Sequence, residues 1–298
     1  MVSVKKKTIR GKEYYYLQHT VRTPTGVRTK EKYLGVRLPR DIDRVSREFL
    51  REIYKERWYP VLDSIRENYQ RERRKTPESA VLKQTRLFSI RFTYDSNRIE
   101  GSSLTYHETA DLLEKGITPR EKSVADVKEA EAHAVVLSEV LKYRKDISLQ
   151  AILFWHMKLF QHTKPDIAGK IRQHQVAISG SKFMPPSPVE VQPLLMEFFR
   201  WYEKNKSSLH PVELAALVHL KLVTVHPFSD GNGRIGRILM NFVLNRHGFP
   251  LLNIAYEKRR SYYSALERAQ LRQDDSIFVQ WLFKRYVKEH WVYAKAGK

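Results

Sequence analysis

Residues 226–237 read His-Pro-Phe-Ser-Asp-Gly-Asn-Gly-Arg-Ile-Gly-Arg. On both sides of this segment apolar residues recur at the spacing of a buried helical face. They are Leu214, Leu217, Val218, Leu222 and Val225 before it and Ile238, Leu239, Phe242 and Val243 after it. The segment is therefore predicted to be a loop between two buried helices, in a fold that is mainly α.

The residue types in this loop suit the binding of an anion. The glycines of Gly231-Asn232-Gly233 let successive backbone N–H groups point into one concavity at the N-terminus of the next helix, where negative charge is stabilised. Arg234 and Arg237 are three residues apart on one helix face and can each bind phosphate oxygens in pairs. Asp230 is suited to hold a Mg²⁺ ion that bridges phosphates. His226 is a candidate general base, because an unperturbed histidine has a pKa of about 6.5.

The composition is that of a globular protein, with 298 residues of which 42% are hydrophobic. No apolar stretch approaches the roughly 20 residues that cross a bilayer. The first residues, MVSVKKKTIRGK, lack the apolar core of a signal peptide. Cysteine is absent, which excludes disulfides and thiolate metal sites. These features predict a cytoplasmic protein with no membrane partner.

Positive charge is concentrated toward the N-terminus. The chain has a formal net charge of +21, and residues 1–75 hold 21 Lys and Arg against 10 Asp and Glu. Such a field attracts nucleic acid or acidic proteins without a sequence preference. A nucleic-acid or acidic partner is therefore predicted for residues 1–75. The alternative is a solvated basic surface with no partner.

Residues 1–75 are predicted to form a separate N-terminal domain that begins with strands. Apolar and polar residues alternate over residues 4–36, and turn residues interrupt the alternation at Arg10-Gly11-Lys12 and at residues 23–26. This pattern predicts a small basic β-meander of three antiparallel strands. So few strands have one face to bury, and they are expected to pack against a following helix.

Two helical segments are predicted after the meander. The apolar period becomes helical from Asp41, and Pro60 marks a break before the second segment. That segment ends in a basic run at Lys75, which is taken as the domain boundary, so that residues 76–298 form the second domain. The apolar stripe of the first segment comprises Ile42, Val45, Phe49 and Ile53.

The second domain is predicted to be almost wholly helical. Its helices begin at recognisable capping residues and end at glycines or basic residues. The predicted helices cover residues 76–99, 105–116, 123–144, 148–162, 189–202, 258–272 and 276–290, in addition to the two that flank the motif. One segment differs, because residues 169–187 combine a β-branched run at 176–178 with flanking glycines and Pro185-Pro186. A β-hairpin with a free edge is predicted there.

The segment HPFSDGNGRIGR at residues 226–237 resembles the signature of Fic-domain proteins. The resemblance covers roughly Thr76 to His290 and includes the hairpin and the run from Arg260 to Leu266. It implies a Fic-type helical bundle with a β-hairpin flap, preceded by the basic β-meander and its helices.

The resemblance implies transfer of AMP from ATP to a Tyr, Ser or Thr hydroxyl of a target protein, with release of pyrophosphate. His226 would be the catalytic base, and Phe228 would anchor the loop in the core. Asp230 would bind Mg²⁺ between the α- and β-phosphates. The phosphate chain would be held by Gly231, Asn232, Gly233, Arg234 and Arg237.

The resemblance also assigns roles outside the motif. The flap would line the nucleotide site and align the target protein by main-chain pairing; its residues are Val176, Ala177, Ile178 and Ser179. Tyr262 and Tyr263 match an aromatic pair near the adenine and ribose, although tyrosines at helical spacing are equally typical of an ordinary core. Gln270 stands where the family often has Asn, which leaves an adenine contact at this position open.

Ser96-Asn97-Arg98-Ile99-Glu100-Gly101 resembles the inhibitory pattern of a large subgroup of the family. A helix that ends at Glu100 would place a carboxylate against Arg237, so that ATP binds with its α-phosphate misaligned; Ser96 is the first residue of the pattern. The alternative is a helix end with an exposed acid. In some relatives the same glutamate positions a water that removes AMP, so deAMPylation stands as a second activity. Self-association into a homodimer is a common control of this inhibition.

Two other interpretations of function are open at this point. Within the family, the transferred group differs between branches and includes UMP, phosphocholine and phosphoryl; Gly233 argues against the phosphoryl branch, whose motif is altered at this position. Outside it, the chain would be a nucleic-acid-associated regulator that uses the Fic domain as a nucleotide sensor. In that case residues 1–75 would bind DNA or RNA and transfer activity would be absent.

Overall fold

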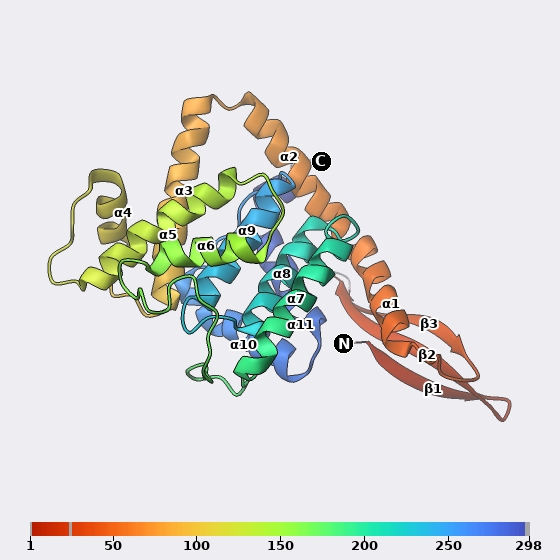
Figure 1. Ribbon diagram of the computed structural model, residues 1–298. Helices are drawn as coiled ribbons and strands as arrows, with labels where there is room; N and C mark the ends of the chain where they lie inside the picture. The colour runs from red at the N-terminus through yellow and green to blue at the C-terminus, as the bar shows by residue number, and fades with distance from the viewer. Residues whose placement is uncertain (1, 24–25, 296–298) are drawn as a thin grey trace. The chain divides into compact units, whose positions relative to one another are not determined.

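The computed structural model describes residues 2–23 and 26–295, and the chain forms two compact units, Met1–Ser64 and Ile65–Lys298 (Figure 1). Within the described ranges, no helix has both the length and the apolar character that crossing a membrane requires.

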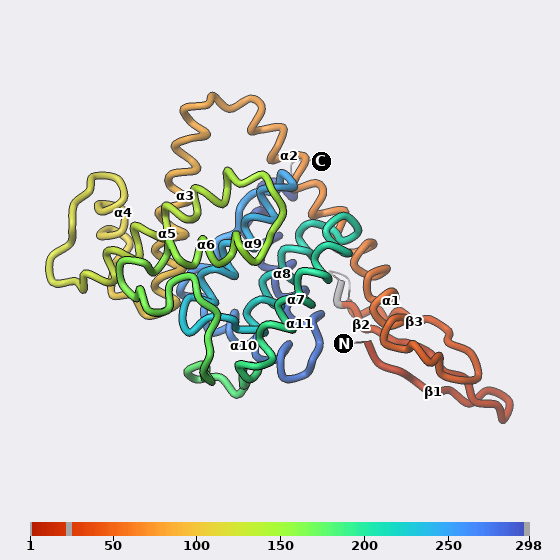
Figure 2. The backbone as a smooth tube through the Cα atoms, in the orientation of Figure 1, coloured from red at the N-terminus to blue at the C-terminus, as the bar shows by residue number. Residues whose placement is uncertain are grey.

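The first unit begins with a three-stranded antiparallel sheet in the order β1-β2-β3 (Figure 2). The strands are β1 (Ser3–Ile9), β2 (Lys12–Thr23) and β3 (Gly26–Gly35). Arg10 and Gly11 make the first turn with positive φ values of 51° and 76°. The predicted meander is therefore confirmed, while Pro24 and Thr25 of the predicted second turn lie outside the described residues.

Helix α1 (Ile42–Arg57) covers one face of this sheet. Leu17 and Val21 of β2 pack against Phe49 and Ile53 of the helix, and all four are buried. The predicted helical stripe is thus the face that completes the small core, because the three strands have no second sheet to bury their apolar side.

Helix α2 (Tyr59–Lys75) crosses the boundary between the two units. The boundary was predicted after Lys75, whereas the compact units divide between Ser64 and Ile65. The second half of the helix is bound to the second unit, because Asn68 donates a hydrogen bond to the carbonyl of Tyr293 (2.8 Å) and Gln70 to that of Gly248 (3.2 Å).

The second unit is helical, and its helices lie where capping residues and apolar periodicity predicted them. The pair α8 and α9 makes the most extensive helix contact of this unit and is buried almost throughout. Its helices are α3 (Glu78–Ile99), α4 (Tyr106–Lys115), α5 (Val124–Lys142), α6 (Leu149–Phe160), α7 (Pro188–Asn205), α8 (Pro211–Val225), α9 (Asn232–Arg246), η1 (Tyr256–Lys258), α10 (Arg259–Leu271), α11 (Asp275–Glu289) and α12 (Trp291–Lys295). The motif loop therefore connects the two central helices, as predicted.

The predicted β-hairpin at residues 169–187 is not formed: this described segment contains no strand. The turn is present, since Gly180 has φ 73° and the N–H of Ser181 donates to the carbonyl of Ile178 (3.0 Å). Pro185 and Pro186 have no N–H to offer a strand ladder. Side chains connect the two halves of the segment instead. Arg172 donates a hydrogen bond to the carbonyl of Pro186 (2.6 Å), and Gln175 donates one to the carbonyl of Pro185 (3.0 Å). We keep the name flap for residues 169–187.

The side chain of Asn241 on α9 binds the backbone of the loop that contains Leu252, before η1, and its contribution to stability can be tested. Its side chain accepts from the N–H of Leu252 (2.8 Å) and donates to the carbonyl of the same residue (3.0 Å), in a fully buried setting. Asn241→Ala leaves both groups unpaired, so we expect a loss of about 2 to 6 kcal/mol in the free energy of unfolding. Asn245→Ala, which removes one part-buried bond to Leu141, should cost about 1 kcal/mol. Equal losses in denaturant titrations would contradict this account.

Candidate active site

The motif loop is closed by its own asparagine. Oδ1 of Asn232 accepts from the N–H of Phe228 (2.9 Å), and Nδ2 donates to the carbonyl of Phe228 (2.8 Å). Gly231, at φ 81°, is the N-cap of α9. The side chain of Asn232 is buried and committed to the loop, so it leaves the backbone of the first turn of α9 to face a ligand.

A buried histidine that sequence reasoning missed supports this loop from α6. Nδ1 of His156 accepts from the N–H of Gly169 (3.0 Å), so Nε2 carries the proton and donates to the carbonyl of Asp230 (3.0 Å). The ring stacks on Phe228 with centroids 3.8 Å apart. Burial lowers the pKa of His156 to about 4, which keeps this tautomer neutral. The flap and the motif loop are thus tied to one another through α6.

His226 ends α8 in the left-handed conformation, with φ 52° and ψ 58°. Its Nδ1 lies 3.1 Å from the carbonyl of Val223, and because a carbonyl only accepts, Nδ1 carries the proton. This leaves the lone pair on Nε2 free to take a proton. Burial lowers the pKa of His226 below its usual 6.5, so the ring is neutral at neutral pH. The geometry and charge state are those of a general base.

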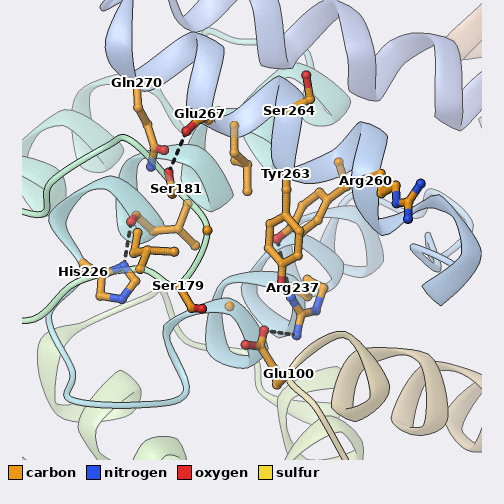
Figure 3. A pocket seen from close by; sticks show the side chains of 16 residues that line it. Glu100, Ser179, Ser181, His226, Arg237, Arg260, Tyr263, Ser264, Glu267 and Gln270 are labelled. Carbon is orange, nitrogen blue, oxygen red and sulfur yellow. Dashed lines mark hydrogen bonds and ion pairs between the residues drawn. The ribbon is translucent and has the colours of Figure 1, made fainter.

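Arg237 on α9 is 1% exposed and is bound by the end of α3. Its Nε donates to Oγ of Ser96 (3.0 Å) and its Nη2 to the carbonyl of Ser96 (2.9 Å). Nη2 also contacts Oε1 of Glu100 at 2.7 Å, an ion pair that Figure 3 shows beside the cavity. The first and fifth residues of the predicted inhibitory pattern therefore bind one guanidinium.

The carboxylate of Glu100 lies against the first turn of α9. A Cβ added to Gly233 would lie 2.2 Å from Oε1 of Glu100 and 2.9 Å from Nη1 of Arg237. The first turn of a helix carries partial positive charge and unpaired N–H groups, so an anion is stabilised there. Glu100 thus places negative charge at the position where the sequence predicts a phosphate.

Ser96 is itself oriented by a buried histidine on α5, His133. Oγ of Ser96 accepts from Nε of Arg237 and shares a hydrogen bond of 3.1 Å with Nε2 of His133. Nδ1 of His133 shares a hydrogen bond of 3.0 Å with Oγ1 of Thr93. Burial, and then the charges of Arg237 and Arg234, hold the pKa of His133 far below its usual value. Neither its spacing nor its neighbours in the sequence pointed to this role.

Arg234 lies in a second charged cluster, apart from the cavity lining. Its guanidinium pairs with Glu129 of α5 and with Asp230 at 3.1 Å, and it is buried. Lys164 also contacts Asp230, at 2.5 Å. Burial alone would raise the pKa of Asp230, but the charges of Arg234 and Lys164 outweigh it and lower that pKa. The contact of Arg234 with phosphate stays a prediction, and in this structure its guanidinium is bound by two carboxylates.

Asp230 fits a magnesium ligand in chemistry and access. Its side chain is 35% exposed and offers hard oxygen donors, and Mg²⁺ is commonly held by one or two carboxylates together with phosphate oxygens. The ammonium of Lys164 at one oxygen is a cation that the metal would have to replace. Among the described residues no group of three or more His, Asp or Glu side chains could hold a metal by itself.

A cavity of about 390 Å³ connects these elements (Figure 3). Of the predicted site residues, Glu100, Ile178, Ser179, His226, Gly233, Arg237, Tyr262 and Tyr263 line it. Ser96 lies behind Arg237, and outside the lining are Val176, Ala177, Asp230, Gly231, Asn232 and Arg234. Its volume is in the range of small-molecule sites.

The two tyrosines of α10 differ in environment. Tyr262 lines the cavity but is only 1% exposed, and its hydroxyl bonds to Nε2 of His219 at 2.8 Å, so most of its side chain is part of the core. Tyr263 is 41% exposed, lines the cavity, and donates to the carbonyl of Ile99 at 3.2 Å. Gln270 also lines the cavity and donates to Oγ1 of Thr224 at 3.2 Å. Both tyrosines of the predicted aromatic pair therefore line the cavity, Tyr262 as a buried residue and Tyr263 as an exposed one.

Glu267 fixes the tip of the flap over the cavity. Its Oε1 accepts from Oγ of Ser181 at 3.2 Å and from the N–H of Lys182. At the base, the buried Arg172 donates to the carbonyls of His226 (2.8 Å) and Pro186 (2.6 Å). Sequence reasoning named neither residue, because each acts on backbone carbonyls or amides far away in the chain.

Comparison with known proteins agrees with this geometry. Residues 146–244 match the Fic/DOC family. The protein adenylyltransferase Fic of Nematostella vectensis is 37% identical over 181 residues, which are 59% of this chain and 42% of the relative. This chain thus matches less than half the length of that relative.

Two solved structures share the fold, and the predicted Fic-type helical fold is confirmed. A Fic domain containing signaling protein from Bacteroides thetaiotaomicron superposes with a TM-score of 0.71 at 28% identity, over 79% of this chain and 97% of that one. Fic-1 from C. elegans superposes with a TM-score of 0.71 at 28% identity, over 86% of this chain and 76% of that one.

The tight packing of the motif loop can be tested with two glycines of similar φ. Gly231 (φ 81°) has no room for a Cβ, which would lie 2.4 Å from the ring of Phe160, whereas Gly180 (φ 73°) has open space. Gly180→Ala should cost about 1 to 2 kcal/mol, the strain of a left-handed alanine. Gly231→Ala should lose about 1 to 3 kcal/mol more through overpacking. Similar unfolding free energies for the two variants would contradict the clash.

Proposed function

We propose that this chain is a protein adenylyltransferase that moves AMP from ATP to a hydroxyl group of a target protein, and that Glu100 inhibits it. The proposal rests on the position of the Glu100 carboxylate, which lies beside Gly233 and pairs with Arg237. This contact indicates an anion-binding site in the same cavity as the proposed base His226. The relatives named protein adenylyltransferase Fic support the type of reaction.

In this mechanism the target hydroxyl attacks the α-phosphorus of ATP. Nε2 of His226 takes the hydroxyl proton as the new O–P bond forms, and the bond from the α-phosphorus to pyrophosphate breaks. Pyrophosphate leaves with the electron pair. Arg237 and the first turn of α9 hold the phosphate chain in line with the attacking oxygen. Asp230 would hold Mg²⁺, which neutralises phosphate charge when bound.

Inhibition follows from competition for one guanidinium. The buried guanidinium of Arg237 is already paired with the carboxylate of Glu100. A phosphate that approaches Gly233 therefore meets this carboxylate, which occupies the same position. Two negative groups cannot both be stabilised there at close range. With Glu100 in place, the phosphate chain is turned away from the line of attack.

The flap is the proposed docking segment for the target protein. Ile178 and Ser179 line the cavity, and the segment carries no strand ladder of its own, so its main chain is available to an extended peptide. Glu267 and Arg172 hold the flap at both ends, which keeps the acceptor hydroxyl near His226. The sensor-only interpretation gains no support from the named relatives, which are transferases.

Substitution of Glu100 and His226 tests the proposal directly. With Mg²⁺ and labelled ATP, Glu100→Gly should raise automodification and target labelling, because Arg237 is then free for phosphate. His226→Ala in the same background should abolish labelling while ATP binding by calorimetry is retained. Intact-mass spectrometry of Glu100→Gly with each nucleotide offered in turn should show a gain of one AMP with ATP, which identifies the donor and the transferred group.

Glu100→Gln separates charge from shape, since it keeps the size of the side chain and loses its charge. Glu121→Gly, at an exposed turn, is the matched control and should label as the wild type does. Equal labelling by wild type, Glu100→Gly and His226→Ala would overturn both assignments. Incubation of AMP-modified Glu100→Gly protein with wild type adds a test of deAMPylation.

The pH profile of Glu100→Gly tests the protonation state of the base. Transfer requires neutral His226, so kcat/KM falls as pH is lowered through its pKa. Because burial lowers this pKa, the acid limb should have its midpoint below pH 6.5, with a plateau at neutral pH. A midpoint above 6.5 would contradict the proposed environment of the base.

A further inference from the structure

The sheet of the first unit has an unusual balance of charge. Residues 1–40 hold 11 Lys and Arg against 2 Asp and Glu. Both acids are already paired, Glu13 with Lys6 and Glu31 with Lys7. The positive excess of this segment is therefore not neutralised within it.

Helix α1 neutralises the lysines of one sheet face only. Lys30 and Lys32 of β3 pair with Glu56 and Glu52 of the helix. These lysines lie opposite His19 and Leu17 of β2 and so share the face that packs on α1. The face that turns away from α1 receives no acid from the helix.

We define the free face as the side chains that alternate with this buried set. Strand register places Lys5 opposite Tyr16 and Lys7 opposite Tyr14, and it places Tyr33 opposite Tyr16 on the other side. Side-chain contacts agree, because Tyr33 lies 5.3 Å from Tyr16 and 6.2 Å from Tyr14 between ring centroids. Among the residues whose side chains the structure describes, the free face comprises Ser3, Lys5, Lys7, Ile9, Lys12, Tyr14, Tyr16, Gln18, Thr20, Val27, Thr29, Glu31 and Tyr33.

On this face, ammonium groups lie beside aromatic rings. The Lys7 ammonium sits 4.7 Å from the ring centroid of Tyr16, and Tyr33 is 55% exposed. Within the described residues, Lys5 and Lys12 have no carboxylate partner. Neighbouring strands are about 4.8 Å apart, so the row from Lys5 through Tyr16 to Tyr33 spans about 10 Å.

We infer that the free face is a docking surface for single-stranded nucleic acid. Lysine ammonium groups would contact the phosphates, and Tyr33 would stack on a base, since every base has an aromatic face. An acidic peptide would use the lysines but has no flat rings for the tyrosines. A duplex hides its bases from stacking. The inference concerns the first unit and does not depend on AMP transfer.

Fluorescence anisotropy with the full chain and a labelled single-stranded oligonucleotide of mixed sequence tests this surface. Lys5→Gln with Lys12→Gln should weaken binding and reduce the slope of log K against log salt by about 1.4, for two lost phosphate contacts. Lys30→Gln with Lys32→Gln removes the same charge from the opposite face and should leave both quantities near the wild-type values.

Tyr33 tests the stacking contact. Tyr33→Ala should weaken binding about 5- to 150-fold, and Tyr33→Phe, which keeps the ring, should bind as the wild type does. Unchanged thermal melting and AMP transfer would show that these variants are folded. Equal losses in the two lysine pairs, no effect of Tyr33→Ala, or equal affinity for a duplex of the same sequence would each overturn the inference.

Discussion

The site depends on how the buried guanidinium of Arg237 is neutralised. A charge with almost no access to water is tolerated in a fold only when opposite charge and hydrogen-bond acceptors surround it. The end of α3 supplies both, through the hydroxyl and carbonyl of Ser96 and the carboxylate of Glu100. The contact of Arg237 with Ser96 and Glu100 therefore both packs α3 against α9 and occupies the anion site. A phosphate at Gly233 would bring the same charge, which is why the proposed reaction and the proposed inhibition share one arginine.

The two arginines of the motif, three residues apart, belong to different networks. Arg237 lines the cavity and binds the end of α3, whereas Arg234 is held by Glu129 and Asp230 and does not line the cavity. The second network includes Lys164, whose ammonium group pairs with the carboxylate of Asp230, the proposed metal ligand. In the structure as described, the proposed base His226 has a free lone pair on Nε2, while the proposed phosphate-binding arginines and the proposed metal ligand Asp230 are engaged by protein groups. This is the arrangement expected of the proposed transferase in its inhibited state.

The charges of the first unit form ion pairs of their own between the sheet and α1. Helix α1 carries acids that pair with lysines on the covered face of the sheet, and the free face leaves Lys5, Lys12 and Tyr33 exposed. Neither feature contributes to the small core formed by Leu17, Val21, Phe49 and Ile53. Exposed surface pairs of this kind add little to stability. The composition of the free face is therefore better explained by recognition than by folding.

The helices, the meander, the motif loop and the pairing of Glu100 with Arg237 could be predicted from the amino-acid sequence, because caps, turns and apolar periodicity are local and the motif is distinctive. Which partner each charged group takes, and which residues reach the cavity, depends on the packing of the folded chain. Arg237 and Ser96 are 141 positions apart, and Glu129 and Lys164 meet Asp230 and Arg234 only through the packing of α5 and α6 on α9. The flap shows the same limit: β-branched residues suggested strands, but prolines without N–H groups and the long reach of Arg172 decided otherwise. Local propensity specifies elements, whereas charge partners and burial are properties of the packed chain.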